Sequence, residues 1–214
     1  PRTRLVGRGN DGSIFPVPHI LWNRTEGRDS SDVVQTRPDG SIIRAFGLFP
    51  DRDFVRVSSR LIVPALFSHS LSILVDGDHV YVGSGDDFLL DVYSLEGEHV
   101  RRISRDFNPR SISPSLLNKH VETLTRKYAL SEKARLRLSR RGRDGALPAH
   151  GSEWVVDNEG RIWIPEYHSE EDPSRVWSVF DQGGLWETDV SFPATFRPAI
   201  IRGRRVIGVQ LDSL

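Results

Sequence analysis

The chain of 214 residues contains no cysteine and no methionine. The lack of cysteine excludes disulfides, thiolate metal ligands and a thiol nucleophile, but it leaves the cellular compartment open, because many secreted proteins also lack disulfides. No apolar run approaches the roughly 20 residues that cross a bilayer, so we predict no transmembrane segment in this chain. Because the chain starts at Pro1, without an initiator or a signal segment, we expect a fragment of a longer protein.

The motifs of several common catalytic sites are also missing. There is no GxSxG elbow, no phosphate-binding glycine loop and no kinase signature. The seven histidines are scattered, without the spacing of metal ligands. We therefore predict neither catalytic residues nor metal ligands from motifs.

Charge of one sign is concentrated in one segment, although the net charge is zero. Of 29 basic and 29 acidic residues, 13 and 3 respectively lie between Arg101 and Arg143. This basic segment has three interpretations: a nucleic-acid patch, a contact for an anionic surface, or an amphipathic cover with a solvated basic face. Aromatic residues within it are few, namely Phe107 and Tyr128. We expect the solvated cover and no nucleic-acid partner.

Two stretches of the sequence repeat one design. VDGDHVYVGSG (75–85) and VDNEGRIWIPEY (156–167) each place an Asp/Gly turn before a strand rich in β-branched and aromatic residues. Each continues with a loop, a strand, a glycine turn and another strand, so we predict two four-stranded antiparallel meanders. Partial copies flank them at about 11–43 and 200–209. The spacing of 44 residues from Ile162 to Val206 is typical of propeller blades.

The repeat is interrupted at about 105–150, where two helices are predicted. Ser113 and Pro114 have the pattern of a helix N-terminus. Apolar residues then recur at helical spacing, at Leu117, Val121, Leu124 and Tyr128. Ser131 can cap a second helix, which the glycines at 142 and 145 and the proline at 148 are expected to end.

Several stretches resemble one group of proteins when they are taken in order. They are RPDGSIIRAFGLFP (37–50), DVYSLEGEHVRRISR (91–105), VVDNEGRIWIPEY (155–167), VWSVFDQGGLWETDVSFP (176–193) and RRVIGVQLDSL (204–214). The chain resembles bacterial six-bladed β-propeller proteins related to NHL-repeat and TolB-like propellers, especially an uncharacterised group of predicted exported proteins. The resemblance implies an all-β fold, with about three blades and part of a fourth from a C-terminal fragment. It also implies a periplasmic, lipid-anchored or secreted location.

Six residues are the candidates for ligand binding, because they follow blade strands at corresponding places and function tends to reside in such loops. They are His69, Asp86, Asp87, Glu166, Tyr167 and His168. The alternative to ligand binding is that His69 is a hydrogen-bonded loop histidine and that the acidic loops are only solvated. Carboxylate oxygens such as those of Asp86 and Asp87 suit calcium, but one pair in one loop does not make a calcium site.

These observations favour a non-catalytic binding propeller with an unknown small-molecule or protein ligand and no cofactor. The alternative is a calcium-dependent propeller hydrolase of the gluconolactonase or paraoxonase type, which would hold a calcium ion through residues from several blades. Four tryptophans lie in or next to the second repeat, at 154, 163, 177 and 186. We expect them to pack between blades, and the other interpretation is a stacking platform for a ligand.

Overall fold

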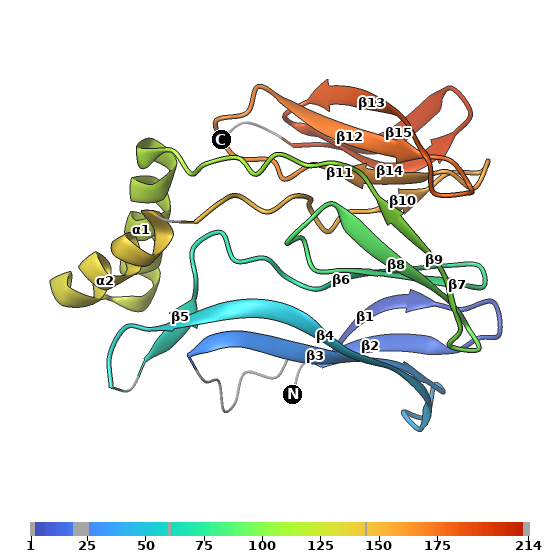
Figure 1. Cartoon of the computed structure of the whole chain (residues 1–214), viewed down its shortest axis with the longest axis horizontal. Helices are drawn as coiled ribbons and strands as arrows, with labels where there is room; N and C mark the ends of the chain where they lie inside the picture. The colour runs from blue at the N-terminus through green and yellow to red at the C-terminus, as the bar shows by residue number, and fades with distance from the viewer. Residues whose placement is uncertain (1–2, 19–25, 60, 144, 212–214) are drawn as a thin grey trace.

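The protein is mainly β, as predicted: strands make up about 48% of the described residues and helices about 13%. The computed structural model describes residues 3–18, 26–59, 61–143 and 145–211. Within these residues the strands form four antiparallel sheets. The sheets lie one against the next in chain order, and the two helices project at one end of the molecule (Figure 1).

Each sheet consists of strands that follow one another in the chain. The first sheet contains β1 (Thr3–Arg8), β2 (Ile14–Pro18), β3 (Gly27–Thr36), β4 (Ile42–Arg56) and β5 (Ile62–Pro64). The second contains β6 (Ser72–Asp76), β7 (His79–Gly83), β8 (Leu89–Ser94) and β9 (His99–Ser104). The third contains β10 (Val155–Val156), β11 (Ile162–Pro165), β12 (Ser174–Phe180) and β13 (Trp186–Pro193), and the fourth contains β14 (Phe196–Arg202) and β15 (Arg205–Gln210).

The two predicted meanders are confirmed as the second and third sheets, in which each strand pairs antiparallel with its neighbours in sequence. The flanking partial copies differ from these meanders in their number of strands. The N-terminal copy is a five-stranded sheet built around the long β3–β4 hairpin, and the C-terminal copy is the β14–β15 hairpin. Residues 212–214, at the end of one of the stretches that carry the resemblance, lie outside the described residues.

One type of turn connects five of the strand pairs. Its glycine donates its N–H to the carbonyl oxygen three residues earlier, and that earlier residue donates its own N–H to the carbonyl just after the glycine. The five glycines have φ values from 76° to 90°, which a side chain would strain. They are Gly12, Gly40, Gly97, Gly160 and Gly184.

The turn between β6 and β7 is different, which corrects the predicted equivalence of residues 75–85 and 156–167. Asp76 pairs directly with His79, so that turn has a two-residue loop with Gly77 at φ 57°. The β10–β11 turn instead closes between Asp157 and Arg161. The two stretches therefore share their strands but not their turn geometry.

Packing between successive sheets supplies most of the core. Side chains of the first and second sheets meet around Phe15, Val80 and Val82. The second and third sheets meet around Leu90 and Phe180, among other fully buried side chains. The third and fourth meet around a separate apolar cluster, and each of the two inner sheets is therefore buried on both faces.

The tryptophans of the third sheet are mainly core residues, as expected. Trp163 and Trp177 pack toward the fourth sheet, and Trp154 packs between the second and third sheets. Ile162 and Ile164, which flank Trp163, lie in the cluster on the opposite side of the strand, as alternation predicts. Trp186 is the exception, because 51% of it is exposed.

The two predicted helices are α1 (Pro114–Tyr128) and α2 (Glu132–Arg143). Ser113 caps α1, because its side-chain oxygen accepts the Leu116 N–H at 3.0 Å. α2 ends at Arg143, among the residues that were predicted to end it, and Gly142 lies in its last turn. A Cβ at this position would lie 2.6 Å from Leu117 Cδ1, so glycine lets the two helices approach. No helix within the described residues is long and apolar enough to cross a membrane.

Candidate functional site

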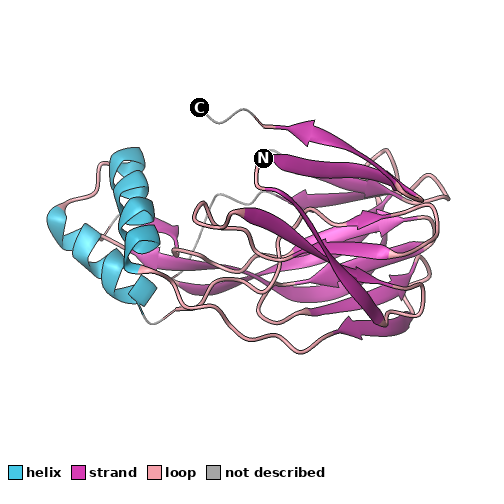
Figure 2. Ribbon diagram, turned by 90° about the horizontal axis from the view of Figure 1, so that it is seen from above, coloured by secondary structure: helices cyan, strands magenta, loops and turns pink. Residues whose placement is uncertain are grey.

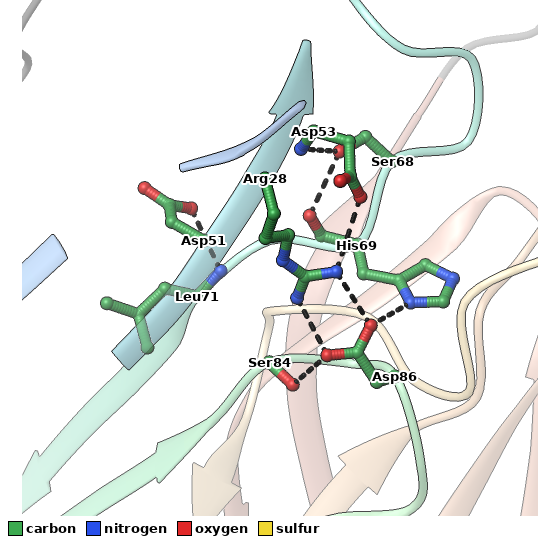
Figure 3. Close-up of polar contacts among 8 residues, drawn as sticks. All are labelled: Arg28, Asp51, Asp53, Ser68, His69, Leu71, Ser84 and Asp86. Atoms are coloured by element: carbon green, nitrogen blue, oxygen red, sulfur yellow. Dashed lines mark hydrogen bonds and ion pairs between the residues drawn. The ribbon is translucent and has the colours of Figure 1, made fainter. Parts of the chain in front are cut away.

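His69 and Asp86, two of the predicted residues, meet at one end of the first two sheets (Figure 3). His69 lies in the segment between β5 and β6, and Asp86 lies in the loop between β7 and β8. The distance between His69 Nδ1 and Asp86 Oδ1 is 2.5 Å. This contact joins the connection from the first sheet to a loop of the second.

Arg28, at the start of β3, holds the same carboxylate from the other side. Its Nη1 and Nη2 atoms donate to the two oxygens of Asp86 at 2.8 and 2.7 Å. Nη1 also reaches Asp53 Oδ2 at 3.2 Å. A bidentate arginine–carboxylate pair is among the more strongly directional polar contacts in proteins. Sequence reasoning missed Arg28, because it lies 58 residues from Asp86 and in no recognisable motif.

These donors keep Asp86 ionised. Its burial alone would raise the pKa of the carboxyl group, but hydrogen bonds from Arg28, from the Ser84 hydroxyl at 2.6 Å and from His69 outweigh that effect and lower the pKa to about 2. Both carboxylate oxygens already accept hydrogen bonds from the protein. Asp86 is therefore a structural anion that positions its neighbours, with little basicity left for proton transfer at neutral pH.

The contact with Asp86 also fixes the hydrogen of His69. In the neutral ring, Nδ1 carries the hydrogen and donates it to the carboxylate, which leaves Nε2 with a lone pair. Figure 3 shows the second ring nitrogen pointing away from Arg28 and Asp86. In this form, His69 presents an oriented hydrogen-bond acceptor at Nε2.

The segment that carries His69 is tied to β4 by hydrogen bonds on either side of the histidine. The Asp53 N–H donates to Ser68 Oγ at 2.6 Å, and this hydroxyl donates to the His69 carbonyl at 3.1 Å. The Leu71 N–H donates to Asp51 Oδ1 at 3.1 Å. The position of the imidazole is therefore set by the strand next to it.

A hollow of about 230 Å³ lies beside this network. Its apolar lining includes Phe49, Pro50, Leu71, Val82 and Leu89, and its polar lining includes Ser84, Asp86, Asp87 and Asp91. Asp91 is paired with Arg102 at 2.9 Å and with His99 at 2.8 Å. Asp87 is exposed and has no hydrogen bond or ion pair with the part of the chain that the structure describes. The hollow therefore combines apolar walls with one carboxylate that is not already neutralised.

A buried histidine, His150, packs near the same loop. It is 4% exposed, and its ring contacts those of Phe88 and Trp154. Burial lowers its pKa, so it is neutral, and its Nδ1–H donates to the Gly151 carbonyl at 3.0 Å. Its Nε2 is buried and has no hydrogen-bond partner among the described residues. Sequence reasoning did not select His150, because nothing in the sequence marks it as buried.

Glu166 belongs to a second polar group. Its carboxylate accepts a hydrogen bond from Arg105, which also donates to Asp189 at 3.1 Å. The guanidinium carbon of Arg105 lies 4.5 Å from the centre of the Phe88 ring. Glu166 is therefore engaged by a cation that is packed on an aromatic face.

Tyr167 and His168 point to different surroundings. Tyr167 packs against the apolar cluster beneath α1, and burial raises the pKa of its phenol. His168 lies near Asp172, with its Nδ1 3.9 Å from a carboxylate oxygen, and burial lowers its pKa. Both residues line a second hollow of about 140 Å³, together with Arg110. The phenol of Tyr167 thus contributes to the helix contact more than to an open surface.

Residues 149–151 connect the two polar groups. The Ala149 N–H donates to the Gly85 carbonyl at 2.9 Å, and the Ala149 carbonyl accepts the Tyr167 N–H at 3.4 Å. The Gly151 N–H donates to the Pro165 carbonyl at 2.8 Å. The chain that returns from α2 therefore fixes the Asp86 loop relative to the exit of β11. The six predicted residues divide between two neighbouring groups on either side of this link.

A metal ion does not fit these residues as they stand. Among the described residues, no three histidine, aspartate or glutamate side chains are grouped so that they could hold a metal ion. The Asp86 and Asp91 carboxylates, which supply oxygen atoms to the first hollow, are paired with arginine. A scan of protein-family models and a search of curated proteins both found no match for this chain.

Proposed function

We propose that the four sheets are consecutive blades of a β-propeller of the six-bladed class, in an extracytoplasmic protein. Three observations support the fold: the inner sheets are four-stranded meanders, successive sheets pack face to face in chain order, and one turn type recurs in the first three sheets. The resemblance of the sequence to exported propeller proteins supports the location.

We propose further that the protein is a binding module without catalytic activity. The observation that carries this proposal is the neutralisation of Asp86 by Arg28, His69 and Ser84 beside a small hollow with apolar walls. A carboxylate held by three donors shapes a surface but neither accepts a proton readily nor attacks a substrate. The free carboxylate of Asp87 lines this hollow and is the charged group that a ligand there would meet, while His69 holds Asp86 in place beside it.

Filling the hollow tests this proposal. Leu89 lines the first hollow and is half-buried, so Leu89→Trp would place an indole in it. A matched change, Val176→Trp, would fill the second hollow instead. In a thermal-shift screen with small amines, sugars and short peptides, we expect compounds that raise the melting temperature of the wild type and of Val176→Trp but not of Leu89→Trp. Compounds that still stabilise Leu89→Trp would count against the first hollow as the binding site.

The alternative, a calcium-dependent hydrolase, makes a different prediction for the same protein. Its support is the set of three aspartates around the first hollow, but two of them are paired with arginine. A hydrolase of that type would gain stability from millimolar calcium and lose it in EDTA, because the ion binds the folded state. We expect the melting temperature to be the same in calcium and in EDTA. A calcium-dependent rise that Asp87→Asn abolishes would support the hydrolase and overturn the binding-module proposal.

A further inference from the structure

The second helix has one buried face and one basic face. Ala134 and Leu138 are buried against the β4–β5 region. On the other side are four residues at positions i, i+3, i+4 and i+7, which places them along one stripe of the helix. They are Lys133, Leu136, Arg137 and Arg140. A leucine therefore stands among three basic side chains.

This stripe, which we call the α2 basic face, is open to a partner. Leu136 is 48% exposed, and Lys133 and Arg140 form no ion pair or hydrogen bond with the described residues. A hollow of about 910 Å³ runs along the face and is lined by all four of its residues. The helix pair projects from the sheets at one end of the molecule (Figure 2). All four residues of the face are exposed.

The chain itself shows which chemistry this face accepts. The carboxylate of Glu26 lies 3.1 Å from Arg137, and it lies 3.7 Å from Arg141 at the margin of the same hollow. Lys119 on the neighbouring helix is paired with Glu170 in the same way. Basic residues of the helix pair thus already form ion pairs with carboxylates from other parts of the chain. The side chains of Lys133 and Arg140 have no such carboxylate partner among the described residues.

We propose that the α2 basic face docks an acidic segment of a partner protein that carries an apolar side chain. Carboxylates of the segment would pair with Lys133 and Arg140, and its apolar side chain would cover Leu136. The stripe is about 10 Å long, at about 1.5 Å per helical residue, which matches two turns of a helix or a few extended residues. A flat anionic membrane fits a hollow poorly, and this face has no aromatic side chain on which a nucleic-acid base could stack.

Fluorescence anisotropy with labelled peptides tests this proposal. The probe is a peptide in which glutamate and leucine alternate, and the matched control peptide replaces each leucine by serine. We expect the wild type to bind the first peptide more tightly and to bind it more weakly as salt is added. Lys133→Glu with Arg140→Glu should weaken binding about tenfold, since each exposed ion pair contributes roughly threefold. Leu136→Ser should weaken it by about fivefold through lost apolar contact.

The matched control is Arg126→Glu with Lys127→Glu, which changes the net charge equally on exposed residues of α1 outside the hollow. This variant should bind like the wild type if the α2 basic face is the site. Equal losses in both double variants would show a nonspecific charge effect and overturn the proposal. Binding to phosphatidylglycerol vesicles or to single-stranded DNA in preference to the peptide would also overturn it. Circular dichroism of each variant excludes loss of the helices, and Leu136→Ser tests the site without any change of charge.

Discussion

At the scale of single residues, the contacts of Asp86 show what its sequence position could not: its carboxylate is already engaged by other side chains of the protein. Its place after a strand suggested a ligand-binding carboxylate. In the structure it accepts hydrogen bonds from Arg28, His69 and Ser84. The residue beside it, Asp87, has none from the described residues. Two adjacent aspartates in one loop therefore differ in their contacts. Only the folded structure shows which of them is hydrogen-bonded and which is free.

Replacing Asp86 by asparagine should destabilise the protein, because Arg28 would lose its carboxylate. Since 39% of the Asp86 side chain is exposed, solvent screens the pair, and we expect a loss of about 1 kcal/mol in the free energy of unfolding at neutral pH. Asp87→Asn is the matched control and should change this free energy by less than about 0.5 kcal/mol. Urea denaturation measures both. Equal effects at the two positions would contradict the assigned role of Asp86.

The effect of Asp86→Asn on the free energy of unfolding should depend on pH in the acid range. The pKa of Asp86 is lowered in the folded state to about 2, so its contribution is present above the unfolded value of 3.8 and is lost as the pH falls from there toward 2. The difference in stability between the wild type and Asp86→Asn should therefore shrink over that range. A difference that stays constant down to the lower limit would show that the carboxylate's charge does not stabilise the fold.

The burial of His150 predicts a second change of stability with pH, closer to neutrality. Burial lowers its pKa in the folded state, so the unfolded chain binds the proton more readily. The stability that neutral His150 contributes is present above the unfolded pKa of 6.5 and is lost as the pH falls below it. His150→Asn, which can still donate to the Gly151 carbonyl, should make this loss shallower in denaturation series between about pH 7 and 5. A slope that stays unchanged in His150→Asn would show that the burial of His150 does not contribute to this pH dependence. His168 also has a lowered pKa, so some slope remains in every variant.

At the scale of elements, the sequence predicted strands and helices well where the pattern is local. The strands of the second and third sheets follow from alternating β-branched residues and glycine turns, and α1 follows from Ser113 and Pro114. The five-stranded N-terminal sheet was only partly predicted, because β4 is long and mostly half-buried and carries no clean alternation. The end of α2 follows from the glycines at 142 and 145 and the proline at 148. The close approach of Leu117 to Gly142 could not be predicted, because it depends on another helix.

The cap of α1 gives a prediction at this scale. Ser113 accepts the Leu116 N–H at 3.0 Å and donates to Glu171 at 2.7 Å, so Ser113→Ala removes both contacts. We expect a loss of about 1 kcal/mol in the free energy of unfolding. Ser115→Ala, at an exposed position in the first turn of the same helix, should be nearly neutral. Thermal denaturation followed by circular dichroism would distinguish them, and an equal shift of both midpoints would argue against the cap.

At the scale of the whole molecule, the sheets depend on one another through their faces. The side chains that join the second and third sheets are among the least exposed in the described chain, including Leu90 and Phe180 at 0%. Alternation along β11 predicted that Trp163 lies on the opposite face from Ile162 and Ile164, but not which sheet each face contacts. In the candidate site, His69 and Asp86 were predicted as separate candidates. Their contact, and the part played by Arg28, could not be predicted, because the three residues come from separate parts of the chain.

The interface between these sheets should be sensitive to truncation. Phe180→Ala removes a fully buried ring from the contact, and we expect a loss of about 3–5 kcal/mol in the free energy of unfolding. Leu185→Ala, in the next turn and 71% exposed, should cost less than about 0.5 kcal/mol. Chemical denaturation measures both values. A small cost for Phe180→Ala would mean that the two sheets do not rely on this contact for stability.

The order of strands within each sheet has a consequence for the rate of folding. Because every sheet is made of strands that are consecutive in the chain, most of its pairings close short loops, which costs little chain entropy. Each sheet can therefore form before its neighbours and offer them an apolar face on which to assemble. The residues at 149–151 are different, because they join loops that are brought together only after two sheets have docked. We expect their amides to gain protection from hydrogen exchange late in refolding, after the amides of β7 and β11.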